Sequence, residues 1–166
     1  MKSIFLFCFA VLFVSDFSIS QLSDSMKLKT PSWVLPIIEK SELMKSYEIL
    51  DRMNPFYFED DFNDDGFLDI VMFVRSKMSG KEGVVIVNGG KNVPFIFGAG
   101  KEIGMGSDIS WCNQWFIYRD KFIYNFDDKK KKFMINHHGI EIVKSETTSV
   151  VIYWDSRRYK THIKHI

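Results

Sequence analysis

Short apolar segments separated by turn-forming residues fill most of this chain after residue 66. The first segment, residues 67–74, is rich in β-branched and aromatic side chains and is apolar at both alternating sets of positions. This pattern is typical of a central β-strand that is covered on both faces. Similar segments recur at close spacing, which predicts an antiparallel meander. We expect these further strands at residues 84–87, 93–97, 115–118, 122–126, 133–135, 149–154 and 158–163.

One helix is expected ahead of these strands. In residues 32–44 apolar side chains recur at helical spacing between charged ones, and Ser32 stands where a helix cap is needed. A first strand is predicted at residues 47–50. The expected fold class is therefore α+β, a single domain over residues 31–166 that is dominated by an antiparallel β-meander with one short N-terminal helix.

Residues 1–20 have the pattern of a cleavable signal peptide. Lys2 precedes an apolar run, residues 4–14, and small residues follow at Ser18 and Ser20. The alternative is a transmembrane helix, but this requires about 20 apolar residues. We therefore expect a secreted or periplasmic protein, and we expect residues 21–30 to form a disordered N-terminal segment.

The charge balance argues against nucleic acid or an anionic membrane as a partner, and the cysteine content argues against disulfide bonds. The chain has 22 Lys and Arg residues and 21 Asp and Glu residues, so no net basic field attracts nucleic acid or an anionic membrane. Once the leader is removed, Cys112 is the only cysteine, and no intrachain disulfide can form. We interpret Cys112 as a small buried core side chain rather than a nucleophile.

The most specific chemical feature is residues 61–69, which we call the acidic loop. Side-chain oxygens recur at every second residue from its start, and Gly66 follows where the backbone must turn around an ion. Crowded carboxylates repel one another unless a cation neutralises them, and an all-oxygen shell is what Ca²⁺ prefers. The alternative is a solvated acidic turn between two strands. We predict a calcium site whose ligands are Asp61, Asn63, Asp65, the carbonyl of Phe67, and Asp69.

The loop differs from an EF-hand, because Met72 stands where the twelfth position needs Glu and because a strand follows instead of a helix. Residues 61–74, DFNDDGFLDIVMFV, resemble the calcium-loop segment of FG-GAP/VCBS-type repeats, in which the ion ligands correspond to the five residues predicted above. The sequence holds a single copy of this pattern, so we expect no full propeller, since one unit cannot bury its own sheet faces. The late segment, residues 139–159, is also similar to that of small bacterial secreted proteins, which implies an envelope protein.

Residues 98–110, which we call the glycine loop, are the candidate contact surface. They look like a phosphate cradle, but Phe95 and Glu102 stand where the Walker pattern needs Gly and Ser or Thr. We interpret the segment as a mobile or partner-facing loop, with Asp108 alternatively capping a turn. Together with the tryptophans that follow, the predicted surface for an unknown protein partner is Gly100, Gly104, Gly106, Asp108, Trp111 and Trp115.

No catalytic residues are predicted. The sequence contains neither Gly-x-Ser-x-Gly nor His-Glu-x-x-His, and we interpret its four histidines as solvated. We therefore hypothesise a secreted, non-catalytic calcium-binding domain that serves as a protein-binding module of the cell envelope. The alternatives are an inhibitor or immunity protein against a periplasmic or extracellular hydrolase, and an enzyme that uses the calcium site.

Overall fold

The computed structural model describes residues 22–41, 43–124 and 132–165. Three short helices precede all the strands: α1 (Asp24–Lys29), α2 (Leu35–Lys40) and α3 (Leu43–Ser46). The strands are β1 (Tyr47–Ile49), β2 (Tyr57–Asp60), β3 (Asp69–Ser76), β4 (Glu82–Asn88), β5 (Val93–Gly98), β6 (Gln114–Tyr118), β7 (Phe122–Tyr124), β8 (Lys132–Met134), β9 (Gly139–Lys144), β10 (Thr148–Trp154) and β11 (Tyr159–His165).

The strands form two larger sheets and one separate hairpin, and every pairing is antiparallel. The first sheet has the order β1-β3-β4-β5, and the second has the order β11-β10-β9-β6. In the first sheet β2 also pairs with β3, with Asp60 opposite Asp69, while β1 pairs with the other end of β3, with Ile49 opposite Val74. β7 and β8 form the hairpin. The α+β, antiparallel fold predicted from the sequence is confirmed, and it is not a propeller.

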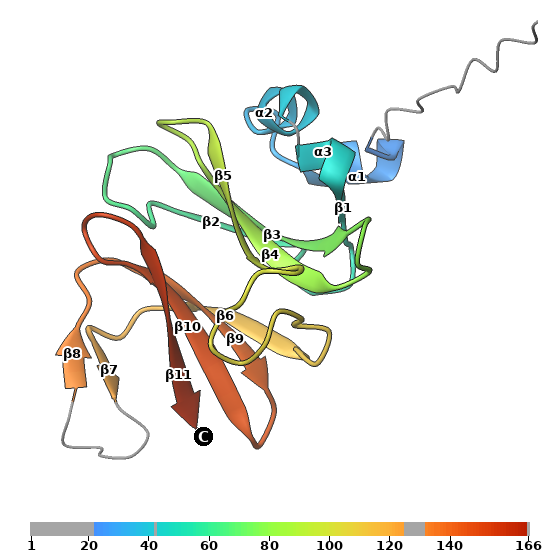
Figure 1. The fold of residues 1–166 in the computed structure, drawn as a ribbon. Coiled ribbons are helices and arrows are strands. Elements are labelled where there is room, and N and C mark those ends of the chain that lie inside the picture. The colour runs from blue at the N-terminus through green and yellow to red at the C-terminus, as the bar shows by residue number, and fades with distance from the viewer. Residues whose placement is uncertain (1–21, 42, 125–131, 166) are drawn as a thin grey trace, which may run out of the picture.

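The fold has three layers, with the first sheet in the middle (Figure 1). The helices cover one face and the second sheet covers the other (Figure 1). Along β3, Val71 and Phe73 enter the core between the sheets, whereas Ile70, Met72 and Val74 enter the core beneath the helices. All five are fully buried, which confirms that this is a central strand covered on both sides.

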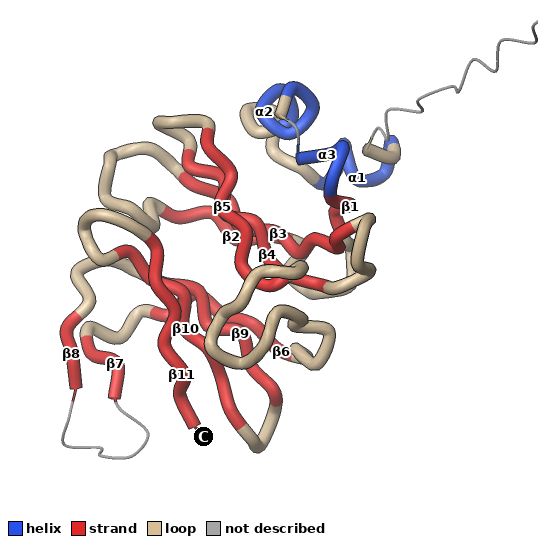
Figure 2. The backbone as a smooth tube through the Cα atoms, in the orientation of Figure 1, coloured by secondary structure: helices blue, strands red, loops and turns tan. Residues whose placement is uncertain are grey.

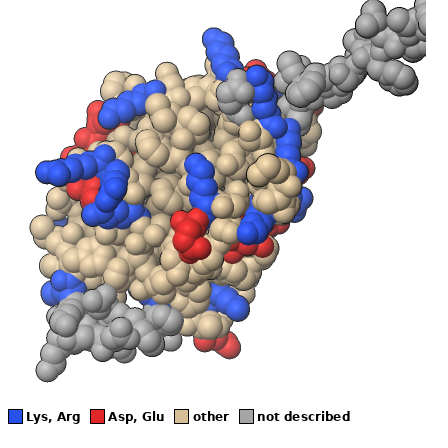
Figure 3. Space-filling model, in the orientation of Figure 1, with Lys and Arg blue, Asp and Glu red and all other residues tan. Residues whose placement is uncertain are grey.

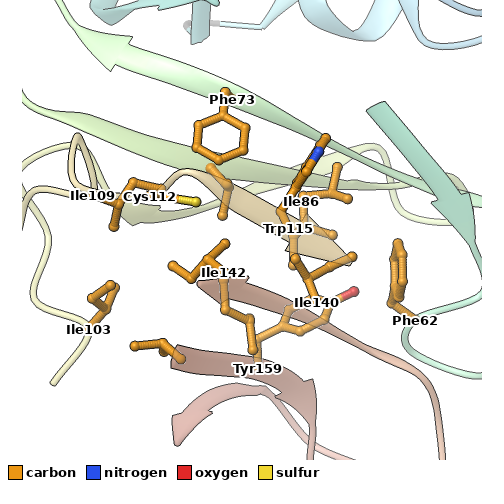
Figure 4. Close-up of a cluster of buried hydrophobic side chains, with 14 of the residues drawn as sticks. Phe62, Phe73, Ile86, Ile103, Ile109, Cys112, Trp115, Ile140, Ile142 and Tyr159 are labelled. Carbon is orange, nitrogen blue, oxygen red and sulfur yellow. The ribbon is translucent and has the colours of Figure 1, made fainter. Parts of the chain in front are cut away.

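The core between the two sheets is closed by side chains from both of them. Phe73 and Ile86 of the first sheet face Ile140 and Ile142 of the second, and Phe62 of the acidic loop packs at one side of the cluster (Figure 4). These side chains are at most 1% exposed. Phe62 thus ties the acidic loop to the core, because withdrawing it would expose a large apolar side chain to water.

The N-terminal region differs from the prediction. The single helix expected at residues 32–44 is replaced by α2 and α3, and Val34 rather than Ser32 precedes the first turn of α2. Residues 21–30 were expected to be disordered, but α1 forms there, with the Ser23 hydroxyl accepting a hydrogen bond from Met26 N at 3.3 Å. The predicted signal peptide, residues 1–20, lies outside the described residues. Within the described ranges, no helix is long and apolar enough to cross a membrane.

All the strands predicted after residue 66 are present, with shifts of at most two residues at their ends. Residues 125 and 126, the end of one of them, lie outside the described part of the chain. β2 and β9 were not predicted. Lys and Arg side chains are interspersed with Asp and Glu on the face seen in Figure 3, in keeping with the balanced composition.

Candidate metal-binding loop

The acidic loop connects β2 to β3 at one end of the first sheet (Figure 2). Its two ends are held in register by the pairing of Asp60 with Asp69. Phe62 and Asn63 are buried, whereas Phe67 and Leu68 are 60% and 56% exposed. The loop therefore has a fixed base in the core and an exposed outer half.

The first two predicted ligands turn their oxygens toward one backbone N–H group. Asp65 N donates to Asp61 Oδ1 and to Asn63 Oδ1, both at 3.1 Å. The second carboxylate oxygen of Asp61 accepts from Gly66 N at 2.9 Å. Since one N–H group is shared by Asp61 and Asn63, their oxygens must lie on the same, inner side of the loop.

The third predicted ligand continues this arrangement. Asp65 Oδ1 accepts from Phe67 N at 3.0 Å, and Asp65 Oδ2 accepts from Asn63 Nδ2 at 3.0 Å. Gly66 has a φ of +83°, which is the left-handed conformation that the sharp turn was predicted to require. The alternating oxygens of the sequence thus fold inward because successive N–H groups of the loop bind them.

Asp69, the last predicted ligand, is fully buried and accepts hydrogen bonds from several parts of the chain. Its Oδ2 accepts from Phe62 N at 3.0 Å and from the Tyr159 hydroxyl at 3.3 Å, and its Oδ1 accepts from Gly89 N at 3.1 Å. Asp69 therefore joins the acidic loop to the turn after β4 and to the second sheet.

The pKa of Asp69 is raised from 3.8 to about 6. Burial is the main cause, and the neighbouring charges of Asp65 and Asp61 add to it, while the N–H donors of Gly89 and Phe62 act in the opposite direction. The acid is thus held where its ionised form is disfavoured in the absence of a cation.

The oxygen chemistry of the loop fits a hard cation. A carboxylate has about four lone-pair sites, and each oxygen of Asp61 and Asp65 accepts a single hydrogen bond from the described residues. Asp69 Oδ1 likewise has one donor, from Gly89. In the described residues there is no group of three or more His, Cys, Asp and Glu side chains placed to hold a metal ion; the predicted ligand set also includes an amide and a backbone carbonyl. These sites would supply calcium with oxygen ligands only.

Acidic residues beside the predicted ligands have partners of their own. Asp60 Oδ2 lies 2.8 Å from His138 Nδ1, and Asp64 Oδ1 lies 3.7 Å from His137 Nδ1. The prediction that His137 and His138 are solvated is therefore wrong. Both histidines contact acidic residues around the loop. Nothing in the sequence pattern indicates this, since the two segments are more than seventy residues apart.

His162 also differs from the prediction of a solvated side chain. It packs edge-on against the Phe133 ring, with centroids 4.8 Å apart. Its Nε2 atom is buried and has no hydrogen-bond partner within the described residues, and burial lowers its pKa. The side chain of His165 lies outside the described part of the chain.

The glycine loop is held by a carboxylate that the sequence did not single out. Glu102 Oε1 accepts hydrogen bonds from Ile103 N at 3.1 Å, Gly104 N at 2.7 Å and Gly106 N at 2.8 Å. Gly100 N donates to Ser107 O at 2.8 Å. Gly100, Gly104 and Gly106 all have φ near +90° to +100°, so the glycines serve a fixed conformation with many hydrogen bonds.

Asp108 caps a turn, which was the plainer of its two interpretations. Its Oδ1 accepts from Glu82 N at 2.9 Å and from Ser110 N at 3.0 Å. Burial alone would raise the pKa of Asp108, but these hydrogen bonds outweigh it, so the pKa lies below its ordinary value. Asp108 thus anchors the end of the glycine loop to β4.

Trp115 was wrongly predicted to lie on a contact surface. It is 3% exposed and belongs to the core between the sheets, where its Nε1 donates to Pro55 O at 3.2 Å. Trp111 is half-buried and packs against the same core. Along β6 the side chains alternate, so Phe116 is the exposed neighbour, at 49%.

Comparison with known proteins adds no assignment: no protein family model, no curated protein and no solved structure matches this chain. The arguments about function therefore rest on the acidic loop and its surroundings.

Proposed function

We propose that this chain is a secreted, non-catalytic domain that binds one calcium ion in the acidic loop. The observation that carries the proposal is the shared N–H group of Asp65, which holds the oxygens of Asp61 and Asn63 together on the inner side of the loop. The ligands would be Asp61, Asn63, Asp65, the Phe67 carbonyl and Asp69.

The role of the ion in this proposal is to stabilise the fold. Asp69 is bonded to the loop, to the turn after β4 and to Tyr159 of the second sheet, so a cation that neutralises it would strengthen the junction of these parts. Sites of the extracellular type have dissociation constants of roughly 0.1 to 1 mM, which suits a compartment rich in calcium.

We also propose that the glycine loop binds a protein partner. Trp115 does not take part in this surface, because it is buried in the core. This loop exposes Lys101, Glu102 and Gly104 while Glu102 fixes its backbone. A loop that is already ordered loses little entropy on binding, which favours a contact surface. The supporting observation is thus the hydrogen-bonded backbone of the loop, and not the flexibility that the glycines suggested.

A thermal melt tests the calcium site. When calcium is about a hundredfold above its dissociation constant, binding to the folded state alone should add about 2.7 kcal/mol to the free energy of unfolding. For a domain of this size this raises Tm by roughly 8 °C relative to chelator. Asp65→Ala should remove this response, because it deletes two of the loop oxygens.

The matched control is Asp120→Ala, which removes an exposed Asp in the turn between β6 and β7. This variant should keep the full calcium response. Identical melting curves of the wild-type protein in chelator and in 10 mM calcium would remove the metal proposal.

A further inference from the structure

The turn between β4 and β5, residues 88–92, packs directly on the acidic loop. Gly89 N donates to Asp69 Oδ1. A Cβ atom on Gly89 would lie 2.2 Å from Leu68 O, and one on Gly90 would lie 2.8 Å from Asp65 Oδ2. The absence of side chains at these two positions is therefore what lets the turn approach the acidic loop, at the carbonyl of Leu68 and at the proposed ligand Asp65.

Asn88 begins this turn and is 1% exposed. Its Nδ2 lies 3.5 Å from Asp69 Oδ2, so its amide group faces the carboxylate. Its Oδ1 is buried and has no hydrogen-bond partner within the described residues. A buried carbonyl oxygen without a partner costs free energy, which a ligand can recover.

We propose that Asn88 supplies a further oxygen ligand to the cation bound by the acidic loop. This inference rests on the proposed calcium site and extends it to a second segment of the chain. The site then consists of the loop before β3 and the turn after β4. These two strands are neighbours in the first sheet.

The spacing around Asn88 suits this role. Its Nδ2 lies 3.5 Å from Asp69 Oδ2, so the amide group stands beside the carboxylate of a proposed ligand. The unpartnered Oδ1 belongs to the same amide group, and the broad terminal torsion of asparagine lets a small rotation turn this oxygen toward an ion.

Asp69 retains the capacity to be the neighbouring ligand. Its Oδ2 already accepts from Phe62 N and from the Tyr159 hydroxyl, whereas its Oδ1 accepts from Gly89 N alone and keeps a lone pair for a cation. One ion therefore serves both the buried carboxylate and the orphaned amide oxygen.

Europium(III), a hard cation of similar size to calcium, provides the test. Its luminescence lifetime in H₂O and D₂O counts the water molecules bound to it. Asn88→Ala should add one bound water and weaken calcium binding about tenfold. Asn88→Asp keeps an oxygen and should keep the wild-type water count. Asn113→Ala, at an asparagine whose side chain binds Ser145, should change neither quantity.

The outcomes separate the two proposals. If the wild-type protein binds neither europium nor calcium, the proposed function fails and the Asn88 inference with it. If it binds both ions and Asn88→Ala leaves the water count and affinity unchanged, only the Asn88 inference is overturned. Should Asn88→Ala not fold, a crystal of the wild-type protein with europium decides: an ion within about 2.6 Å of Asn88 Oδ1 supports the inference, and a longer distance rejects it.

Discussion

Asp69 is the residue on which the acidic loop depends. It was predicted as a ligand from its place in the sequence pattern, but its burial and its contacts with Gly89 and Tyr159 were not predictable, because these partners lie 20 and 90 residues away. A single sequence shows the alternation of acids; it does not show which of them the fold will bury. The other predicted ligands lie within seven residues of one another, and their geometry follows from local hydrogen bonds that the sequence spacing does determine.

The pH dependence of stability without calcium should reveal Asp69. Its pKa rises from 3.8 to about 6 on folding, so the folded chain binds this proton more tightly than the unfolded chain. The resulting stability is complete below about pH 4 and is lost as the pH rises through 6, by an amount on the order of 3 kcal/mol. In urea titrations with chelator, wild type should therefore lose more stability between pH 4 and pH 7 than Asp69→Asn does. Equal losses would show that Asp69 does not titrate in this range.

At the scale of elements, strands with two apolar faces or clear turns were predictable, whereas β2 and β9, which carry acidic residues inside the strand, were not. β3 is apolar at all its central positions. β9 carries Glu141 in its centre, where Ser149 donates to it at 2.5 Å and Lys164 lies 3.0 Å away. β2 carries Glu59, which accepts from Trp33 at 2.7 Å. Such partners come from distant segments, so the sequence alone gives no reason to place these acids in strands.

Charge also joins β4 to its surroundings. Glu82 is 9% exposed and pairs with Arg52 Nε at 2.7 Å and with Arg75 Nη2 at 2.9 Å. Arg52 in turn donates to Cys112 O at 2.8 Å and to Ile109 O at 3.2 Å. The pair thus links the first sheet to the segment that leads into β6.

Glu82→Gln should lower the free energy of unfolding by about 2 kcal/mol, because it leaves two arginines without their shared, largely buried charge. Glu48→Gln is the matched control. Glu48 pairs with Arg75 at 3.6 Å in an exposed position, so its loss should cost less than about 0.5 kcal/mol. Urea denaturation measures both, and similar costs for the two variants would contradict this account.

For the whole molecule, the contact of Tyr159 with Asp69 connects the second sheet to the acidic loop. Tyr159 is 8% exposed and its ring packs against Trp154 and Phe95, with centroids 4.9 and 5.1 Å away. Burial and the charge of Asp69 raise the pKa of its hydroxyl, which therefore stays protonated and able to donate. The sequence predicted the layers of this fold only as a meander; that the loop, the turn at residues 88–92 and β11 meet is a property of the packed sheets.

Tyr159→Phe should keep the ring contacts and remove only the hydrogen bond to Asp69. We expect a loss of about 1.5 kcal/mol in the free energy of unfolding, since the acceptor is a charged group when calcium is absent at neutral pH. Tyr124→Phe, at a 45% exposed position, should change stability by less than about 0.5 kcal/mol. If Tyr159→Phe were as stable as wild type in chemical denaturation, the hydrogen bond between Tyr159 and Asp69 would contribute nothing to the free energy of unfolding.

The central claim is that the inward-facing oxygens of the acidic loop hold one calcium ion. Isothermal titration of the calcium-free protein with calcium chloride tests it most directly. The account predicts one ion per chain, a dissociation constant of roughly 0.1 to 1 mM, and no measurable binding by Asp65→Ala under the same conditions. Absence of binding to the wild-type protein at 10 mM calcium, or equal binding by Asp65→Ala, would contradict it.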